Sequence, residues 1–329
     1  MNQFVITRIL LCVTIVFSAS IHTAVGQDET QPELLPDFAY TTSHKGYSGI
    51  YLRSGNRSKL ISPKFKNAKY PTWSPDGKRI AFQAKKDGQF DLYILDIGTG
   101  EHSRLTNQSS TEMHPAWSPD GKSIAFEADP EDEYSFEIYL IDVDGKNFRR
   151  FTREIDGTSL PAWSPDGKQI AFSVPYRKIF KEGSENLTLD NKSVAGYIYV
   201  ANKNGLNLRK ITNGKTTCTT QAWTPDGNKI VFSSTRKDHL GKLSDMQLFV
   251  INSDGKNLRQ LTKLPGQNIS PNWSPHKDKI LFHSTAYKHP NEPEKNSSEI
   301  YVINSDGTGL TRLTNNKYDD YFPVWRPVP

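Results

Sequence analysis

The ten-residue stretch WSPDGKRIAF, from Trp73 to Phe82, decides the fold because the chain repeats it. The later copies are WSPDGKSIAF from Trp117, WSPDGKQIAF from Trp163, WTPDGNKIVF from Trp223 and WSPHKDKILF from Trp273. A shortened sixth copy begins at Trp325, so all six tryptophans of the protein belong to the series. Such a recurrence is an internal repeat of structural units.

Each copy predicts a β-hairpin followed by two further strands. Pro and Asp-Gly after the Trp suit a tight turn, and the large-small-large pattern of Ile80 to Phe82 is typical of a packed strand. An apolar segment such as Leu92 to Leu95 and a segment ending in Arg-Leu-Thr, at Arg104 to Thr106, complete the unit. Four strands in roughly 40 to 50 residues is the period of a propeller blade.

The two ends of the chain together supply one more blade. Three strands are expected near the N-terminus, at Phe38 to Tyr40, Gly49 to Leu52 and Lys59 to Ser62, and a first strand at Phe322 to Trp325 near the C-terminus. We therefore predict an all-β fold, a six-bladed β-propeller with four antiparallel strands per blade. A split blade of three N-terminal strands and one C-terminal strand closes this ring and leaves no open sheet edge between the two ends.

Variation in length is confined to one connection of the blade. In all five whole copies Trp to Phe is 9 residues, Tyr or Phe to Thr is 13 and Thr to the next Trp is 11. The connection from the second to the third strand varies from 11 to 27 residues. In an up-and-down blade these loops share a face with the blade-to-blade crossings, so we expect this elaborated face to bind a partner. A neutral, solvated rim is the alternative. The candidate binding residues of the loops are Glu131, Asp132, Arg177, Lys178, Arg236 and Lys237.

The first 26 residues have the features of an export signal. Arg8 precedes an apolar run from Ile9 to Phe17, and Ala24 and Gly26 suit a cleavage site. We expect residues 1–26 to be a signal peptide, 27–37 a linker and 38–329 the propeller, in a periplasmic or secreted protein; an uncleaved anchor is the alternative. No later run is apolar for 18 residues, so no membrane span is expected after cleavage.

The charge pattern gives no sign of a nucleic-acid partner. The net charge is +5, and the lysines are scattered over the turns rather than clustered. We expect a monomer without bound nucleic acid.

The phrase WSPDGKxIAF, followed by IYxI, DGxN and RLT, resembles the propeller repeat of the TolB type, a WD-like repeat that covers Phe38 to Trp325. The resemblance implies the propeller fold and a periplasmic protein of the Tol–Pal envelope system. TolB has an α/β domain before its propeller, whereas only about 11 residues separate signal and first strand here, so the resemblance extends to the propeller alone. It leaves binding to an envelope lipoprotein or another protein as the implied activity, because the shared residues belong to turns and core rather than to a site.

The mouth of the central channel is the second candidate site. The innermost strands and their crossings are expected to bring polar and aromatic side chains toward the axis, where they can hold a peptide or a sugar. A water-filled channel is the alternative. The candidate residues are Lys69, Tyr70, Glu112, His114, Gln221, Asn268 and Tyr321.

No motif of a known catalytic type is present. The sequence has no GxSxG elbow, and its histidines form neither HxH nor HExxH. We therefore assign no catalytic residue, metal or cofactor and predict a non-catalytic scaffold that binds a protein of the cell envelope. The alternative is a propeller enzyme acting on a polysaccharide, lyase- or glycosidase-like, as in oligogalacturonate lyase, whose site would lie at the channel mouth. A structural subunit whose partner carries the chemistry is a third possibility.

One copy departs from the repeat. Pro275, His276, Lys277 and Asp278 replace Pro-Asp-Gly, so the hairpin lacks its turn glycine. We expect Asp278 to take the left-handed conformation there, because Asp tolerates it better than most residues.

Overall fold

The computed structural model divides the chain into two compact units, Met1–Leu35 and Pro36–Pro329. All the strands of the described residues belong to the second unit. The structure describes residues 35–86, 88–129, 136–152, 155, 157–175, 196–213, 217–235, 245–286, 288–289 and 292–328.

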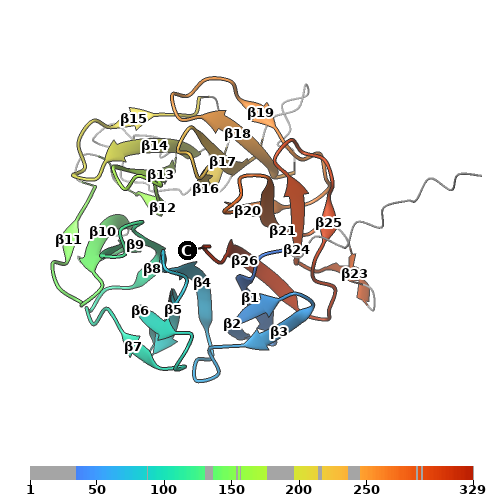
Figure 1. The fold of residues 1–329 in the computed structure, drawn as a ribbon, viewed down its shortest axis with the longest axis horizontal. Helices are drawn as coiled ribbons and strands as arrows, with labels where there is room; N and C mark the ends of the chain where they lie inside the picture. Colours follow the sequence, from blue (N-terminus) through green and yellow to red (C-terminus); the bar gives the residue numbers. More distant parts are fainter. Residues whose placement is uncertain are drawn as a thin grey trace, which may run out of the picture. The chain divides into compact units, whose positions relative to one another are not determined.

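Six four-stranded antiparallel sheets form a ring, and the described residues contain no α-helix (Figure 1). This confirms the prediction of an all-β, six-bladed propeller. The blade formed by both chain ends contains β26 (Asp319–Trp325), β1 (Phe38–His44), β2 (Tyr47–Ser54) and β3 (Arg57–Leu60). The next two contain β4 (Ala68–Trp73), β5 (Arg79–Lys86), β6 (Gln89–Asp96) and β7 (His102–Arg104), then β8 (Glu112–Trp117), β9 (Ser123–Ala128), β10 (Glu137–Asp142) and β11 (Arg149–Arg150).

The remaining three blades come next in chain order. Their strands are β12 (Ser159–Trp163), β13 (Gln169–Pro175), β14 (Gly196–Asn202) and β15 (Arg209–Lys210); β16 (Cys218–Trp223), β17 (Lys229–Ser234), β18 (Gln247–Asn252) and β19 (Arg259–Gln260); and β20 (Asn268–Trp273), β21 (Lys279–Ser284), β24 (Glu299–Asn304) and β25 (Thr311–Arg312). A separate hairpin of β22 (Lys288–His289) and β23 (Glu292–Asn296) lies in the connection between β21 and β24.

The innermost strands β4, β8, β12, β16, β20 and β26 each contact the next one around the ring (Figure 1). Strand β26 pairs with β1, with Phe38 opposite Trp325 and Thr42 opposite Asp320. Strand β26, in red, therefore lies beside β1, in blue, and the circle of sheets is continuous (Figure 1).

A threonine hydroxyl explains the fixed 13-residue spacing in each blade. Thr106 Oγ1 accepts a hydrogen bond of 2.9 Å from the backbone N–H of Leu92, on the third strand. The same bond recurs at Thr152, Thr212, Thr262 and Thr314, and Ser62 makes it in the split blade. It satisfies a buried backbone donor just where the short fourth strand ends.

The core lies between neighbouring blades. The phenylalanine that ends each repeat phrase, such as Phe82 or Phe126, is completely buried and packs against the third-strand tyrosine, or Phe249, of its own sheet. Indole nitrogens add bonds between neighbouring blades: Trp223 Nε1 donates to Ala162 O at 3.1 Å and Trp325 Nε1 to Asn272 O at 3.2 Å.

The first hairpin turns have the predicted chemistry, with one correction. Ser74 Oγ donates to Asp76 Oδ1 at 2.5 Å, and Gly77 has φ of 65°. In the fifth whole blade Lys277, not Asp278, takes the left-handed conformation, with φ of 67°. The expectation for Asp278 was wrong because Lys277 occupies the turn position of Gly77 and donates the same backbone bond, to Ser274 O at 3.1 Å. Asp278 instead accepts a 2.7 Å bond from Ser274 Oγ and so replaces the missing turn aspartate.

Candidate functional site

Every innermost strand contains a bulge at the same position, three residues before its tryptophan. The residue there has φ between 48° and 57°, in the left-handed region that costs an L-residue roughly 1–2 kcal/mol. The strand register shifts at this point, and a bulge of this kind redirects a side chain. The six residues are Tyr70, His114, Leu160, Thr220, Ser270 and Phe322.

Side chains of the preceding blade hold these bulges in place. The backbone N–H of His114 donates to Gln83 Oε1 at 2.9 Å, and that of Leu160 donates to Glu127 Oε1 at 2.5 Å. Both acceptors come directly after the buried phenylalanine of a second strand. These two bulges are therefore tied to the neighbouring blade, which compensates for their backbone strain.

A third bond of this type uses a histidine. The N–H of Phe322 lies 3.4 Å from Nδ1 of His283, the residue at the same repeat position as Gln83. Burial lowers the pKa of His283 to about 3, so its imidazole is neutral at ordinary pH and Nδ1 can accept this bond.

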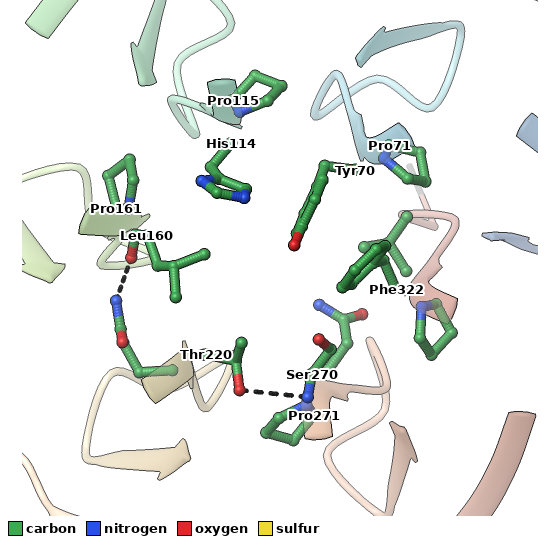
Figure 2. Close-up of a pocket in the computed structure, with 15 residues that line it drawn as sticks. Tyr70, Pro71, His114, Pro115, Leu160, Pro161, Thr220, Ser270, Pro271 and Phe322 are labelled. Carbon is green, nitrogen blue, oxygen red and sulfur yellow. Dashed lines mark hydrogen bonds between the residues drawn. The ribbon is translucent and has the colours of Figure 1, made fainter. Parts of the chain in front are cut away.

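The six bulge residues surround a cavity on the channel axis. Figure 2 shows their side chains converging from all sides, with the Tyr70 hydroxyl pointing into the open centre. The cavity encloses about 140 Å³. The proline or glutamine after each bulge residue also lines it, and of the lining residues in the described part of the chain only Tyr70 and His114 are titratable.

One side of the cavity is an aromatic cluster. The rings of Tyr70 and Phe322 stack at 3.7 Å between centroids, and the imidazole of His114 lies edge-on to Tyr70 at 4.0 Å. Burial raises the pKa of Tyr70 above its ordinary value, so the phenol stays protonated and can donate a hydrogen bond. This side therefore offers a flat apolar surface with one polar tip.

A buried carboxylate orients the imidazole. Glu127, which is 3% exposed, places Oε1 2.7 Å from His114 Nδ1 and accepts the Leu160 N–H with the same oxygen. The pair fixes the ring of His114 toward the cavity. It also provides an ion pair whenever the imidazole is protonated.

The opposite side is polar but internally bonded. Thr220 Oγ1 accepts from the Ser270 N–H at 3.2 Å and donates to Ser233 at 2.9 Å. Gln221 donates its amide to Leu160 O and accepts from Ser173. The Oγ of Ser270 is buried without a hydrogen-bond partner among the described residues.

The seven residues predicted at the channel mouth separate into three groups. Tyr70, His114 and Gln221 line the cavity. Glu112 and Asn268 are completely buried and bond to nearby protein groups: Ser110 Oγ donates to Glu112, and Asn268 Nδ2 donates to Met246 O.

Lys69 and Tyr321 each lie one residue before a bulge residue and are half-buried, outside the residues that line the cavity. Prediction missed Leu160, Thr220, Ser270 and Phe322. A fixed signal could have found them, because each lies three residues before a repeat tryptophan.

The predicted loop residues Glu131, Asp132, Arg177, Lys178, Arg236 and Lys237 lie outside the described residues. Within the described ranges, no three His, Cys, Asp or Glu side chains gather as they would around a metal ion. The same ranges hold no helix of the length and apolarity that a membrane crossing requires.

Comparisons with known proteins agree with the propeller fold. The family model of the TolB beta propeller domain matches residues 31–197. An uncharacterized protein of Agrobacterium fabrum is 37% identical over 78 residues, which are 22% of this chain and 26% of that protein. The chain thus matches about a quarter of this relative's length.

Two solved structures share the architecture. TolB from Acinetobacter baumannii superimposes with a TM-score of 0.70 at 20% identity, covering 89% of this chain and 67% of that one. An oligogalacturonate lyase in complex with manganese superimposes with a TM-score of 0.56 at 17% identity, covering 86% and 74%. At these identities the likeness shows the fold alone.

Proposed function

Because this chain belongs to the TolB beta propeller domain family, we propose that it is an exported, non-catalytic propeller that binds a protein of the cell envelope. The bound element is an apolar or aromatic segment of the partner, seated in the channel mouth. The elaborated face, where the second-to-third-strand loops emerge, supplies the surrounding contacts.

The observation that carries this proposal is the aromatic cluster of Tyr70, Phe322 and His114 at an open cavity. Aromatic side chains at the centre of a contact supply much of the binding energy of protein interfaces. No carboxylate or ammonium group is among the described lining residues, which suits an uncharged segment. The hydroxyl of Tyr70, which points into the cavity, can then bond to its backbone.

The rigidity of the site also favours binding. Each bulge residue is fixed by a left-handed backbone, and inter-blade bonds hold His114, Leu160 and Phe322. A site that is already ordered loses little conformational entropy when a partner binds, which raises affinity.

Export is the second part of the proposal. It is supported by Arg8, the apolar run from Ile9 to Phe17 and the small residues up to Gly26. We propose cleavage near Gly26, followed by the linker 27–37 and a monomeric propeller in the periplasm or medium. N-terminal sequencing of the mature protein tests this part: a chain that begins at Met1 contradicts it.

Site-specific photocrosslinking in the native envelope tests the binding site. A photoreactive residue at Leu160, in the cavity, should form an adduct with one partner protein, whose crosslinked peptide can be sequenced. The matched control is Lys168, an exposed residue of the hairpin turn in the same blade, expected to give no such adduct. Phe322→Ala, combined with the Leu160 probe, should abolish the adduct.

The rival function is an enzyme acting on a polysaccharide, and the His114–Glu127 pair is the observation that favours it. The two proposals differ in outcome. An absent adduct at Leu160, together with cleavage of a polysaccharide that His114→Ala abolishes, would reject the binding proposal.

A further inference from the structure

The interface between the β20–β25 blade and the split blade, where the two ends of the chain meet, is called the closing interface here, and it differs from the other five interfaces between blades. In every whole blade, the residue two positions after the third-strand aromatic is apolar, at most 3% exposed and packed between blades. These residues are Leu95, Ile141, Ala201, Ile251 and Ile303. In the split blade the same position is Arg53, on β2, which is half-buried.

A hollow of about 470 Å³ lies at this interface. One wall comes from the split blade and includes Tyr51, Arg53 and Asn56. The other comes from the segment that leads from β25 to β26 and includes Asn315 and Tyr318. The volume is within the roughly 300–1,000 Å³ of small-molecule sites, whereas the channel cavity is smaller.

The guanidinium of Arg53 is held in place without a carboxylate partner. Its Nε donates to Gly55 O at 2.9 Å and its Nη1 to Leu313 O at 2.6 Å, across the interface. No Asp or Glu of the described residues forms an ion pair with it. By contrast, Arg104 pairs with Asp91 at 2.7 Å in a neighbouring blade.

An oriented, half-buried guanidinium with donors to spare is suited to an anion. Arginine presents five N–H donors in a planar fork that matches a carboxylate, and the two carbonyl bonds of Arg53 leave donors unused. The exposed amides of Asn56 and Asn315 stand on opposite walls and can each donate and accept. Such groups suit hydroxyls, which also donate and accept.

Aromatic rings complete the lining. Tyr40 and Tyr51 lie 5.9 Å apart between ring centroids, and Tyr318 faces them from the other wall. Burial raises the pKa of Tyr40 to about 12, so its hydroxyl is protonated at ordinary pH. The rings offer apolar surface to the carbon skeleton of a ligand.

We propose that this closure hollow binds a carboxylate-bearing sugar, with the carboxylate on Arg53 and the ring hydroxyls on Asn56 and Asn315. Such a ligand contacts both ends of the chain at once. Its binding therefore stabilises the closed ring, because a ligand that binds only the folded state raises the unfolding temperature. The site is separate from the channel mouth, and its test does not depend on the proposed protein partner.

A matched pair of ligands tests the assignment on the intact mature protein. D-glucuronate and D-glucose share the sugar ring and differ in the carboxylate, and inorganic phosphate supplies an anion without a sugar. Calorimetric titration should show glucuronate binding about tenfold or more tightly than either of the others. Glucuronate, and not glucose, should raise the melting temperature.

Protein variants separate the two halves of the site. Arg53→Gln should weaken glucuronate binding about tenfold. Arg57→Gln, an equal loss of charge at an exposed position of the same hairpin, should leave it unchanged. The side chain of Asn315 is exposed. Asn315→Ala should therefore weaken glucuronate binding and leave the melting temperature of the protein without ligand unchanged.

Three results would overturn the proposal. They are no glucuronate binding at about 10 mM, equal binding of glucose or phosphate, and unchanged binding by both Arg53→Gln and Asn315→Ala. Each can be scored whatever the outcome of the crosslinking experiment.

Discussion

The interface between the β4–β7 and β8–β11 blades and the interface that closes the ring use the same repeat positions with opposite chemistry. The first is filled by apolar side chains, among them Ile141 and Phe126. The second has Arg53 and Tyr40 at those positions and contains a hollow. The regular interface shows what the repeat needs for stability, and the closing interface shows where it has been changed without loss of the fold.

The largest effect is expected from exchanging these two chemistries. Ile141→Arg places a charge where Ile141 is 1% exposed and should cost more than about 4 kcal/mol, because the guanidinium has neither water nor a partner there. The reverse change, Arg53→Leu, should cost less, about 1–2 kcal/mol, because it removes one exposed and one part-buried bond to backbone carbonyls and leaves no charge without water. Urea unfolding measures both; equal losses would show that the two interfaces are not different in kind.

Truncating the aromatic residues should give the next largest contrast. Phe126→Ala removes a completely buried ring and should cost about 3–5 kcal/mol. Tyr51→Ala removes a half-buried ring that already borders the hollow, so a cost below about 2 kcal/mol is expected. Thermal or urea unfolding of the two variants, side by side, checks the ratio.

A pH-dependent difference should arise from two carboxyls at one repeat position. Glu112 and Asp320 each lie five residues before a repeat tryptophan, are completely buried, and have their pKa raised to about 7 by that burial. Between about pH 4 and 7 the folded state holds protons that the unfolded state has lost, so stability falls as pH rises. Each group contributes at most about 1.4 kcal/mol per pH unit.

Amide variants isolate this contribution. Asn268 occupies the same position in another blade, so Asp320→Asn and Glu112→Gln should fold. Each should flatten part of the slope of unfolding free energy between pH 4.5 and 7, and the double variant most of it. His283 acts in the opposite direction, because its pKa is lowered to about 3: its contribution is complete above about pH 6.5 and is lost as pH falls toward 3. A wild-type slope retained in the double variant would reject the assignment.

The contrast between regular and altered positions also explains how much the sequence could predict. The tryptophan phrase and the fixed spacings predicted blades, strands and core, because they reflect bonds such as Thr106 to Leu92 that every blade repeats. The cavity was found only in part. Alternation along a strand cannot reveal a bulge, so Tyr70 and His114 were chosen while Leu160 and Phe322, at the same position, were missed.

The closing interface was invisible for a different reason. The repeat aligns Arg53 with Leu95 and Ile141, two residues after the third-strand aromatic, but an arginine by itself is an ordinary surface residue and does not show that a hollow lies beside it. The hollow depends on two segments about 260 residues apart, joined where Arg53 donates to Leu313 O. No local pattern in the sequence carries that juxtaposition.

The smallest change in stability is expected at Lys277, which replaces the turn glycine of the other repeats. The substitution tests whether this departure from the repeat only strains the backbone. Lys277 holds the left-handed conformation that glycine holds at Gly77 and Gly227, and it is exposed. Lys277→Gly should stabilise the protein by about 1 kcal/mol, since glycine avoids the left-handed penalty of roughly 1–2 kcal/mol but is more flexible when unfolded. The control, Gly227→Ala, should destabilise it by a similar amount because φ there is 71°. Unfolding midpoints in urea measure both. If Lys277→Gly does not raise the free energy of unfolding, contacts of the lysine side chain offset its backbone strain. This hairpin then resembles the closing interface, where a departure from the repeat forms contacts of its own.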